Sequence, residues 1–340
     1  MRKVNVAVMG ATGAVGACFL RILEERMFPV NNIRLLASER STGKKLKFNG
    51  KMYPVEVLTH DSFKGIDIVL ASAGASRSLE FLPSAVKAGA VCVDNSSAFR
   101  MDDNVPLVVP EVNPEMIKMH KGIIANPNCS TIQMVVALWP IHKKAGIKRI
   151  IVTTLQASSG AGHGAVEQLR QENLSIAASG CDNVQVNLEN KSMPQQSAYN
   201  VFPHIGSFVE GDYTNEEWKL VKETRKIMHD NKIRISATCV RVPVRTGHSE
   251  SVYIETEKPI TPQKVREILS KAPGVSLIDD PANNFYPMPK DIEGKDEVFV
   301  GRIRQDAFVK KGLWLWVVAD NLRKGAATNA VQIAEVLAKG

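Results

Sequence analysis

The sequence predicts an α/β protein of two domains, the first with a parallel sheet and the second with a mixed sheet. The chain has 340 residues, enough for two domains that each bury a hydrophobic core. Up to residue 130, short apolar segments alternate with helical periodicity, which is typical of a parallel sheet covered on both faces. Beyond residue 126 the apolar segments become longer and partly alternate with polar residues, which favours a mixed or antiparallel sheet.

The first domain is expected to contain short strands between helices. Residues 14–26 show helical spacing of apolar residues directly after a glycine-rich turn. The expected strands are near-continuous apolar runs at residues 4–9, 33–37, 66–71, 91–93, 107–109 and 123–125. Strands of this kind predict a doubly wound parallel sheet.

The second domain is expected to begin with a helix over residues 130–144, kinked at Pro140 and ended by Gly146. Longer strands are expected at residues 149–157, 233–244, 251–257, 297–303 and 313–319, and a loop rich in Gly, Asn and Ser at residues 179–196. The amphipathic segment 326–339 predicts a last helix that packs back on the first domain. We therefore expect one domain at residues 1–127 with 321–340, and the other at residues 128–320.

Composition argues against several classes of protein. The net charge is +8, but Lys and Arg occur singly or in short pairs, so no nucleic-acid partner is expected. No apolar run approaches the roughly 20 residues of a membrane span, and the N-terminus lacks the features of a secretory signal. The five cysteines are scattered without metal-ligand spacing, which favours a cytoplasmic protein with free thiols and no metal.

A glycine-rich turn, GATGAVG at residues 10–16, connects the first strand to the first helix. In a dinucleotide-binding fold such glycines permit a tight turn, close approach of the backbone to a pyrophosphate, and close packing of helix on strand. The helix N-terminus then faces the anion. The turn therefore predicts a Rossmann-type domain. The expected cofactor contacts are Gly10, Thr12, Gly13, Ala14, Val15 and Gly16.

The segment after the second strand predicts which nicotinamide cofactor binds. It contains Ser38, Glu39, Arg40 and Ser41. Arg40 with flanking hydroxyl groups suits a ribose 2′-phosphate, which favours NADP. Two alternatives stay open, because Glu39 suits the free 2′-hydroxyl of NAD and Arg40 could be a solvated loop charge.

Cys129 is the candidate nucleophile. It lies in NPNCST, residues 126–131, at the start of an apolar helix. The positive end of the helix dipole and nearby backbone N–H groups favour the thiolate, which is the nucleophilic form of cysteine. A buried structural cysteine is the alternative, and it is our interpretation of Cys18, Cys92 and Cys239.

Five segments together resemble aspartate-β-semialdehyde dehydrogenase. They are GATGAVG at 10–16, SSAFR at 96–100, NPNCST at 126–131, LQASSGAG at 155–162 and RVPVRTGHSES at 241–251, and the resemblance covers nearly the whole chain. It implies an NADP-binding N-terminal domain completed by the C-terminal helix, and a central domain for catalysis and homodimer contact. The implied reaction reversibly converts L-aspartyl-4-phosphate and NADPH to L-aspartate 4-semialdehyde, phosphate and NADP+, in lysine (through diaminopimelate), threonine and methionine biosynthesis.

This chemistry assigns roles to individual residues. Cys129 would displace phosphate to form a thioester, and hydride would reduce that thioester. His248 would act as general acid/base, with His163 in a glycine-rich loop as the second candidate. Arg241 suits the substrate α-carboxylate, because a guanidinium group pairs bidentately with a carboxylate.

The resemblance implies further contacts around these residues. Gln156 would orient the substrate, Glu216 would pair with its amino group, and Asn128 would help hold the acyl oxygen. Arg100 and Lys219 would bind phosphate, although a surface ion pair between Glu216 and Lys219 is an alternative. The implied late cofactor contacts are Ser159, Gly160 and Asn321.

The sequence is less consistent with three other functions. N-acetyl-γ-glutamyl-phosphate reductase shares the chemistry, but its N-acylated substrate has no free amine for an acid such as Glu216. Glyceraldehyde-3-phosphate dehydrogenase differs in the contexts of its cysteine and histidine. A non-catalytic NADP-binding protein would not require an intact set of Cys129, Gln156, Arg241 and His248.

Overall fold

The computed structural model describes residues 1–180, 186 and 191–339. It divides into two units, Met1–Cys129 with Gly325–Gly340, and Ser130–Lys324. Most of the loop expected at residues 179–196 lies outside the described residues. Across the described ranges, no helix is long and apolar enough to cross a membrane.

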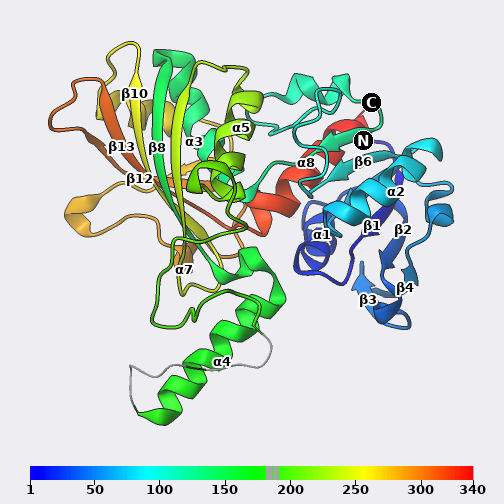
Figure 1. Ribbon diagram of the computed structural model, residues 1–340. Coiled ribbons are helices and arrows are strands. Elements are labelled where there is room, and N and C mark those ends of the chain that lie inside the picture. Colours follow the sequence, from blue (N-terminus) through cyan, green and yellow to red (C-terminus); the bar gives the residue numbers. More distant parts are fainter. Residues whose placement is uncertain (181–185, 187–190, 340) are drawn as a thin grey trace. The chain divides into compact units, whose positions relative to one another are not determined.

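The first unit is built on a sheet with the strand order β3-β4-β2-β1-β5-β6-β7 (Figure 1). Its strands are β1 (Val4–Met9), β2 (Val30–Ala37), β3 (Lys45–Phe48), β4 (Lys51–Val57), β5 (Ile68–Ala71), β6 (Val91–Asp94) and β7 (Ile123–Ala125). Neighbouring strands are parallel, apart from the antiparallel pair β3 and β4. The parallel, doubly wound sheet predicted from the sequence is confirmed, and the strand order reverses at β1.

Helices of the first unit cover this sheet with apolar faces. They are α1 (Ala14–Glu25), α2 (Ala75–Lys87) and α8 (Thr328–Lys339), with 3-10 turns η1 (Glu39–Ser41), η2 (His60–Phe63) and η3 (Pro114–Met119). Helix α1 buries Phe19, Ile22 and Leu23, which recur at helical spacing. Arg26, just after α1, holds Glu335 of α8 through two hydrogen bonds of 2.7 and 2.8 Å. The last helix therefore packs on the first domain, as predicted.

Two expectations for the first unit were wrong or incomplete. Residues 107–109 do not form a strand; Leu107 makes an isolated bridge to Ala125. The cause is local, because Pro106 and Pro110 flank the segment and cannot donate to a strand ladder. The hairpin of β3 and β4 was not anticipated, although Asn49 and Gly50 between these strands both have positive φ, as a two-residue hairpin turn requires.

The second unit is built on a mixed sheet with the order β11-β12-β13-β10-β8-β9. Its strands are β8 (Ile147–Gln156), β9 (Arg234–Arg241), β10 (His248–Thr256), β11 (Val275–Leu277), β12 (Val298–Gln305) and β13 (Gly312–Ala319). The pairs β8–β9 and β11–β12 are parallel, and the remaining neighbours are antiparallel. A mixed sheet was predicted and is confirmed. Strand β10 begins at His248 rather than at residue 251, because His248 and Ser249 already pair with β13.

The helices of the second unit are α3 (Cys129–Ala145), α4 (His163–Ser179), α5 (Asn215–Met228), α6 (Pro262–Leu269) and α7 (Pro289–Ile292). Short turns are η4 (Ser158–Ala161), η5 (Glu210–Asp212) and η6 (Pro281–Asn283), and a π-helical turn, η7 (Arg323–Ala327), precedes α8. Helix α3 contains Pro140 and is followed by Gly146 with φ of +65°, so the expected C-terminal stop is present. Helix α5 packs against β9 and begins with a capping box formed by Thr214 and Glu217.

Candidate active site

A cavity of about 650 Å³ opens in the first unit at the carboxyl ends of β1, β2, β4 and β5. Its lining residues are Gly10, Thr12, Gly13, Ala37, Ser38, Glu39, Arg40, Val57, Leu58, Ser72, Ala73 and Arg77. Ligands of open parallel sheets bind at this edge, where the strand order reverses. The cavity therefore has the position and size of a dinucleotide site.

The glycine loop is shaped for close approach. Gly10 has φ of +85°, and a Cβ there would lie 2.3 Å from the carbonyl oxygen of Ser72. A Cβ on Gly16 would lie 2.2 Å from the carbonyl oxygen of Gly10. Both positions exclude any side chain, which brings the start of α1 against the turn and points its N-terminus at the cavity. Gly13 precedes α1 and lines the cavity directly.

Two arginines, Arg40 and Arg77, line the cavity together with Glu39. Arg77 lies near the start of α2, after the carboxyl end of β5, and sequence reasoning missed it. The signal that could have found it is its place just beyond a parallel strand. Ser41 does not line the cavity, but its hydroxyl lies 3.2 Å from that of Thr12. Two cations at one rim favour an additional phosphate group.

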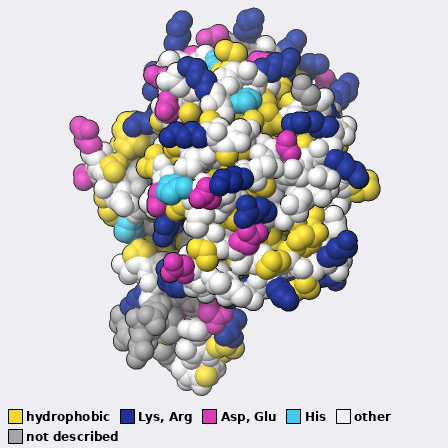
Figure 2. Space-filling model, turned by 90° about the vertical axis from the view of Figure 1, so that its right-hand side faces the viewer, with side chains coloured by type: hydrophobic (Ala, Val, Ile, Leu, Met, Phe, Trp, Pro, Cys, Tyr) yellow, Lys and Arg dark blue, Asp and Glu magenta, His cyan; other side chains and the backbone are white. Residues whose placement is uncertain are grey.

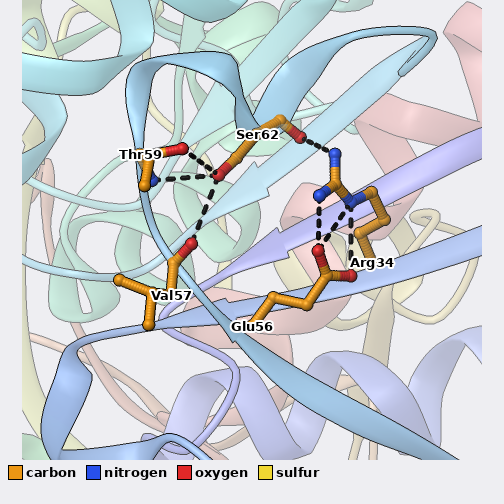
Figure 3. A network of polar contacts seen from close by, with 5 residues as sticks. All are labelled: Arg34, Glu56, Val57, Thr59 and Ser62. Carbon is orange, nitrogen blue, oxygen red and sulfur yellow. Dashed lines mark hydrogen bonds and ion pairs between the residues drawn. The ribbon is translucent and has the colours of Figure 1, made fainter.

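A polar network next to the cavity links β2, β4 and η2 (Figure 3). Arg34 binds the carboxylate of Glu56 through Nε and Nη2, and its Nη1 donates to the carbonyl oxygen of Ser62 at 2.6 Å. The Ser62 hydroxyl accepts from the Thr59 backbone N–H at 2.9 Å. It also donates to the carbonyl oxygen of Val57 at 3.4 Å. The network fixes the end of β4, where Val57 and Leu58 line the cavity.

Cys129 is the first residue of α3, as predicted, and it is partly exposed. The turn before it is held within the first unit. The Arg100 guanidinium donates from Nε to the carbonyl oxygen of Asn126 at 2.9 Å and from Nη2 to that of Asn95 at 2.7 Å. Asn126 also accepts a 2.7 Å hydrogen bond from Asn329 of α8. By contrast, Cys92 and Cys239 are fully buried, and burial raises the pKa of both thiols.

The sheet of the second unit places three predicted residues in one row. Gln156 of β8 pairs with Arg241 of β9. Ser249 of β10 pairs with Leu155, so His248 and Gln156 are the next residues along their antiparallel strands. Residues opposite one another in a sheet project from the same face. We call His248, Gln156 and Arg241 the catalytic row; their side chains are at most 5% exposed.

Helices α3 and α5 supply polar partners to the middle of the catalytic row. The Gln156 amide nitrogen donates to the Ser130 hydroxyl at 2.9 Å and to Glu216 Oε1 at 3.2 Å. Ser130 directly follows Cys129 in the chain. Lys219 donates from Nζ to Glu216 Oε2 at 3.0 Å. The ion pair named as an alternative is therefore present, with Glu216 buried and Lys219 partly exposed.

The His248 ring is held in one orientation. Its Nδ1 accepts a hydrogen bond from the backbone N–H of Ala157 at 3.0 Å, so the proton of the neutral ring lies on Nε2. Nε2 is buried and has no hydrogen-bond partner within the described residues. Burial, with a smaller contribution from the positive charge of Arg241, lowers the pKa of His248 to about 3. The imidazole is therefore neutral and offers one N–H.

The turn before His248 is hydrogen-bonded to residues of the second unit that are expected to contact the cofactor. Asn321 Oδ1 accepts from the Gly247 N–H at 2.9 Å, and the side chains of Asn321 and Ser159 are hydrogen-bonded. A Cβ on Gly160 would lie 3.0 Å from His248 Nε2 and 3.3 Å from Arg241 Nη1. Gly160 therefore leaves room beside the groups that would meet a substrate.

Some predicted residues are not brought together by these contacts. His163 begins α4 and is exposed, away from the hydrogen bonds of the catalytic row. Arg100 belongs to the first unit and Lys219 to the second. Groups of three or more His, Cys, Asp or Glu able to hold a metal ion were not found in the part of the chain that is described. On the face drawn in Figure 2, Lys and Arg side chains are scattered, with Asp and Glu side chains among them.

The chain is similar to known proteins over nearly its whole length. Residues 5–120 match the family model "Semialdehyde dehydrogenase, NAD binding domain", and residues 138–324 match "Semialdehyde dehydrogenase, dimerisation domain". The aspartate-semialdehyde dehydrogenase of Aquifex aeolicus is 60% identical over 338 residues, which are 98% of either chain.

Two solved structures are similar over the full length. Aspartate semialdehyde dehydrogenase II from Vibrio cholerae, complexed with ASA, is 47% identical with a TM-score of 0.95, and the match covers 100% of this chain and 99% of that one. Aspartate semialdehyde dehydrogenase with NADP from Candida albicans is 27% identical with a TM-score of 0.76, covering 99% and 98%.

Proposed function

The chain belongs to the aspartate-semialdehyde dehydrogenase family, and on this premise we propose a role for each residue of the candidate site. The protein has aspartate-semialdehyde dehydrogenase activity in aspartate-family amino-acid biosynthesis. The proposal concerns how its residues perform that reaction. The observation that carries it is the hydrogen bond that joins Gln156 of the catalytic row to Ser130, the second residue of α3.

Cys129 forms the covalent intermediate. Its thiolate attacks the acyl carbon of L-aspartyl-4-phosphate, the carbon–oxygen bond to phosphate breaks, and inorganic phosphate leaves. The N-terminal end of α3 stabilises the negative charge on sulfur before the attack. Asn128, which precedes Cys129, is the candidate for holding the acyl oxygen.

His248 stabilises the charge that develops on the substrate oxygen. When bound, NADPH supplies a hydride to the thioester carbon. The Nε2–H of His248 then donates to the alkoxide, and collapse of the alkoxide expels the Cys129 thiolate and yields the aldehyde. Hydride delivery and collapse of the alkoxide require a hydrogen-bond donor and no net proton transfer, whereas the departing phosphate takes up one proton. For the hydride and collapse steps we therefore narrow the expected acid/base role of His248 to hydrogen-bond donation.

Arg241 and Glu216 select the amino-acid part of the substrate. Arg241 pairs with the α-carboxylate, and Glu216 pairs with the free α-amino group. Gln156, which donates to Glu216 and lies opposite Arg241 in the sheet, orients the substrate. An N-acylated substrate would lose the contact with Glu216, which argues against the N-acetyl-γ-glutamyl-phosphate reductase alternative.

NADP binds in the cavity of the first unit, with its 2′-phosphate at Arg40 and Arg77. The cofactor contacts that line the cavity are Gly10, Thr12, Gly13, Ser38 and Arg40. Support comes from the two cations and from NADP in the related Candida albicans structure. Contacts of Ala14, Val15, Gly16, Ser41, Ser159, Gly160 and Asn321 with the cofactor stay predictions.

Replacing Arg40 by Ala should raise the Michaelis constant for NADP+ roughly 10- to 100-fold, because a charged hydrogen bond to the 2′-phosphate is lost. The Michaelis constant for NAD+ should change little. Arg77→Ala should act in the same direction, whereas Arg21→Ala, an exposed arginine of α1 outside the cavity, should not. Initial rates with both cofactors measure this. An equal loss for NADP+ and NAD+ would show that Arg40 supports the loop and does not bind the 2′-phosphate.

Arg100 and Lys219 bind inorganic phosphate and the acyl phosphate in this proposal. Arg100→Leu and Lys219→Ala should each raise the Michaelis constant for phosphate roughly tenfold or more, and change that for NADP+ far less. Arsenate should replace phosphate in the wild type and be affected by the same variants. Lys222→Ala, an exposed lysine of α5, is the matched control. Unchanged phosphate dependence in both variants would reject the site.

We also propose a homodimer and a cytoplasmic location. The match of residues 138–324 to a dimerisation domain supports the dimer. The thiols of Cys92 and Cys239 form no disulfide bond within the described residues, which supports a reducing compartment.

The reaction assay tests the proposed function most directly. Purified protein should reduce NADP+ in the presence of L-aspartate 4-semialdehyde and phosphate. It should remain inactive with N-acetylglutamate semialdehyde in place of the substrate. Turnover of the N-acetylated aldehyde at a comparable rate would overturn the assignment of Glu216.

A further inference from the structure

Two buried polar residues, Gln133 and Glu250, lie outside the proposed reacting set. Both are fully buried. Gln133 is four residues after Cys129 on α3, so the two residues share one face of the helix. Glu250 is two residues after His248 on β10, so it projects from the same face of the sheet. Each residue therefore follows a proposed reacting residue along its own element.

Glu250 belongs to a second row, next to the catalytic row. It pairs with Thr154 of β8, which pairs with Cys239 of β9, and its neighbour on β13 is Val317. Gln133 connects this row to the catalytic row, because its Nε2 donates to the backbone carbonyl oxygen of His248 at 3.4 Å. Helix α3 and strand β10 are thereby joined through one amide.

Several oxygen atoms in this arrangement have no hydrogen-bond partner. Within the described residues, these include both carboxyl oxygens of Glu250 and Oε1 of Gln133. Burial raises the pKa of the Glu250 carboxyl well above its usual range, and the adjacent Gln133 amide offsets this only in part. Full burial without a hydrogen-bond partner among the described residues favours the neutral, protonated form of this carboxyl group. An unpaired buried donor destabilises the fold, so a proton on this carboxyl group favours a hydrogen bond to a neighbouring acceptor.

A neutral carboxyl group can satisfy the amide oxygen of a neighbouring glutamine. Its O–H donates to that oxygen, a bond that an ionised carboxylate cannot make. The Gln133 amide nitrogen keeps its hydrogen bond to the His248 carbonyl oxygen. Rotating the amide by half a turn would place its oxygen against that carbonyl oxygen, so the orientation of Gln133 is fixed. An ionised Glu250 would place a hydrogen-bond acceptor against Oε1 of Gln133, which is also an acceptor. Both groups would then remain unpaired.

We propose that Glu250 is a protonated carboxylic acid that forms an acid–amide pair with Gln133, and that this pair positions the start of α3 against the strand that carries His248. Glu250 and Gln133 are positioning residues. They act through the helix of Cys129 and the backbone of His248, and they do not contact the substrate. The positioning role rests on the proposed functions of Cys129 and His248, whereas the protonated state of Glu250 does not.

Infrared spectroscopy of the intact protein tests the protonated state without any assay of activity. Wild-type protein at neutral pH should show a carbonyl band of a protonated carboxylic acid, shifted in D2O and absent in Glu250→Gln. Glu172 is the matched control, because this buried carboxylate accepts from the backbone N–H groups of Ser197 and Ala198 at 2.8 Å. Glu172→Gln should leave the band in place. A wild-type spectrum without the band would overturn the proposal.

Steady-state kinetics test the positioning role. Glu250→Leu and Gln133→Leu should each lower kcat about tenfold while the Michaelis constant for NADP+ stays unchanged, because the loss corresponds to roughly one hydrogen bond. Glu250→Gln, which restores a neutral pair, should stay within about threefold of the wild type. The double leucine variant should lose no more than either single variant. Additive losses, or no rescue by Glu250→Gln, would refute the pair even if Cys129 and His248 act as proposed.

Discussion

Cys129→Ala should lose turnover by roughly 10⁴- to 10⁶-fold, because the covalent step has no other nucleophile in the proposed site. Affinity for NADP+ should be retained, since the cavity lining does not include Cys129. The measurement is the rate of NADPH formation at saturating substrate, with cofactor affinity determined by fluorescence titration. Cys239→Ala, which removes a buried thiol from β9, is the control and should keep turnover within a few fold.

Alkylation gives an independent measure of the same assignment. Iodoacetamide should label Cys129 fastest, because it is partly exposed at the start of α3, and substrate should protect it. Mass spectrometry of tryptic peptides locates the label. The competing alkylation site is Cys181, which lies outside the described residues. Equal labelling of Cys181, together with activity that survives Cys129→Ala, would contradict the assignment.

His248→Ala should lower kcat by roughly 10²- to 10³-fold, the usual effect of removing one preorganised donor to a developing oxyanion. His248→Gln should recover part of this loss, because its amide again offers an N–H. Chelators should leave the wild type unaffected. His163→Ala is the control, since His163 is an exposed residue of α4. Normal turnover in His248→Ala with a large loss in His163→Ala would reverse the assignment.

The protonation of His248 gives this prediction a pH signature. The folded-state pKa of about 3 lies below the unfolded value of about 6.5, so the unfolded chain binds the extra proton between these values. Stability contributed by neutral His248 is therefore present above pH about 6.5 and is lost as pH falls, by roughly 1.4 kcal/mol per pH unit. His248→Gln should flatten this part of the curve of unfolding free energy against pH. Its kcat profile should match that of the wild type between about pH 5 and 8, where His248 stays neutral.

Local features of the sequence predicted much of the fold and the site. The backbone of the turn at residues 10–16 leaves no room for a Cβ atom at Gly10 or Gly16. The spacing of the glycines in the sequence is enough to predict this turn. Cys129 directly precedes an apolar helical segment, so its place at a helix start could be predicted too. The Asn49–Gly50 signal was equally local and was overlooked.

Relations between distant strands could not be predicted in the same way. Gln156, Arg241 and His248 form a row only because β8 pairs with both β9 and β10 in one register, and a shift of one residue would turn Gln156 to the other face. The resemblance named these residues, but spacing along the chain does not give their register. The proposed pairing of Gln133 with Glu250 depends on how α3 packs against β10, which is also a relation between distant segments. Arg77 joins the cofactor cavity because β5 lies beside β1, which again is a relation across the sheet.

The place of α8 has a consequence for how the chain is made. The first unit contains residues from both ends of the chain, and Asn329 of α8 holds both the Val108 carbonyl oxygen and the Asn126 side chain. During synthesis, the sheet of that unit emerges before this helix, because residues 130–324 of the second unit are made in between. The turn before Cys129 therefore reaches its final hydrogen bonding only after α8 has emerged from the ribosome. A nascent or truncated chain can hold the glycine loop and the cysteine without yet holding an assembled enzyme.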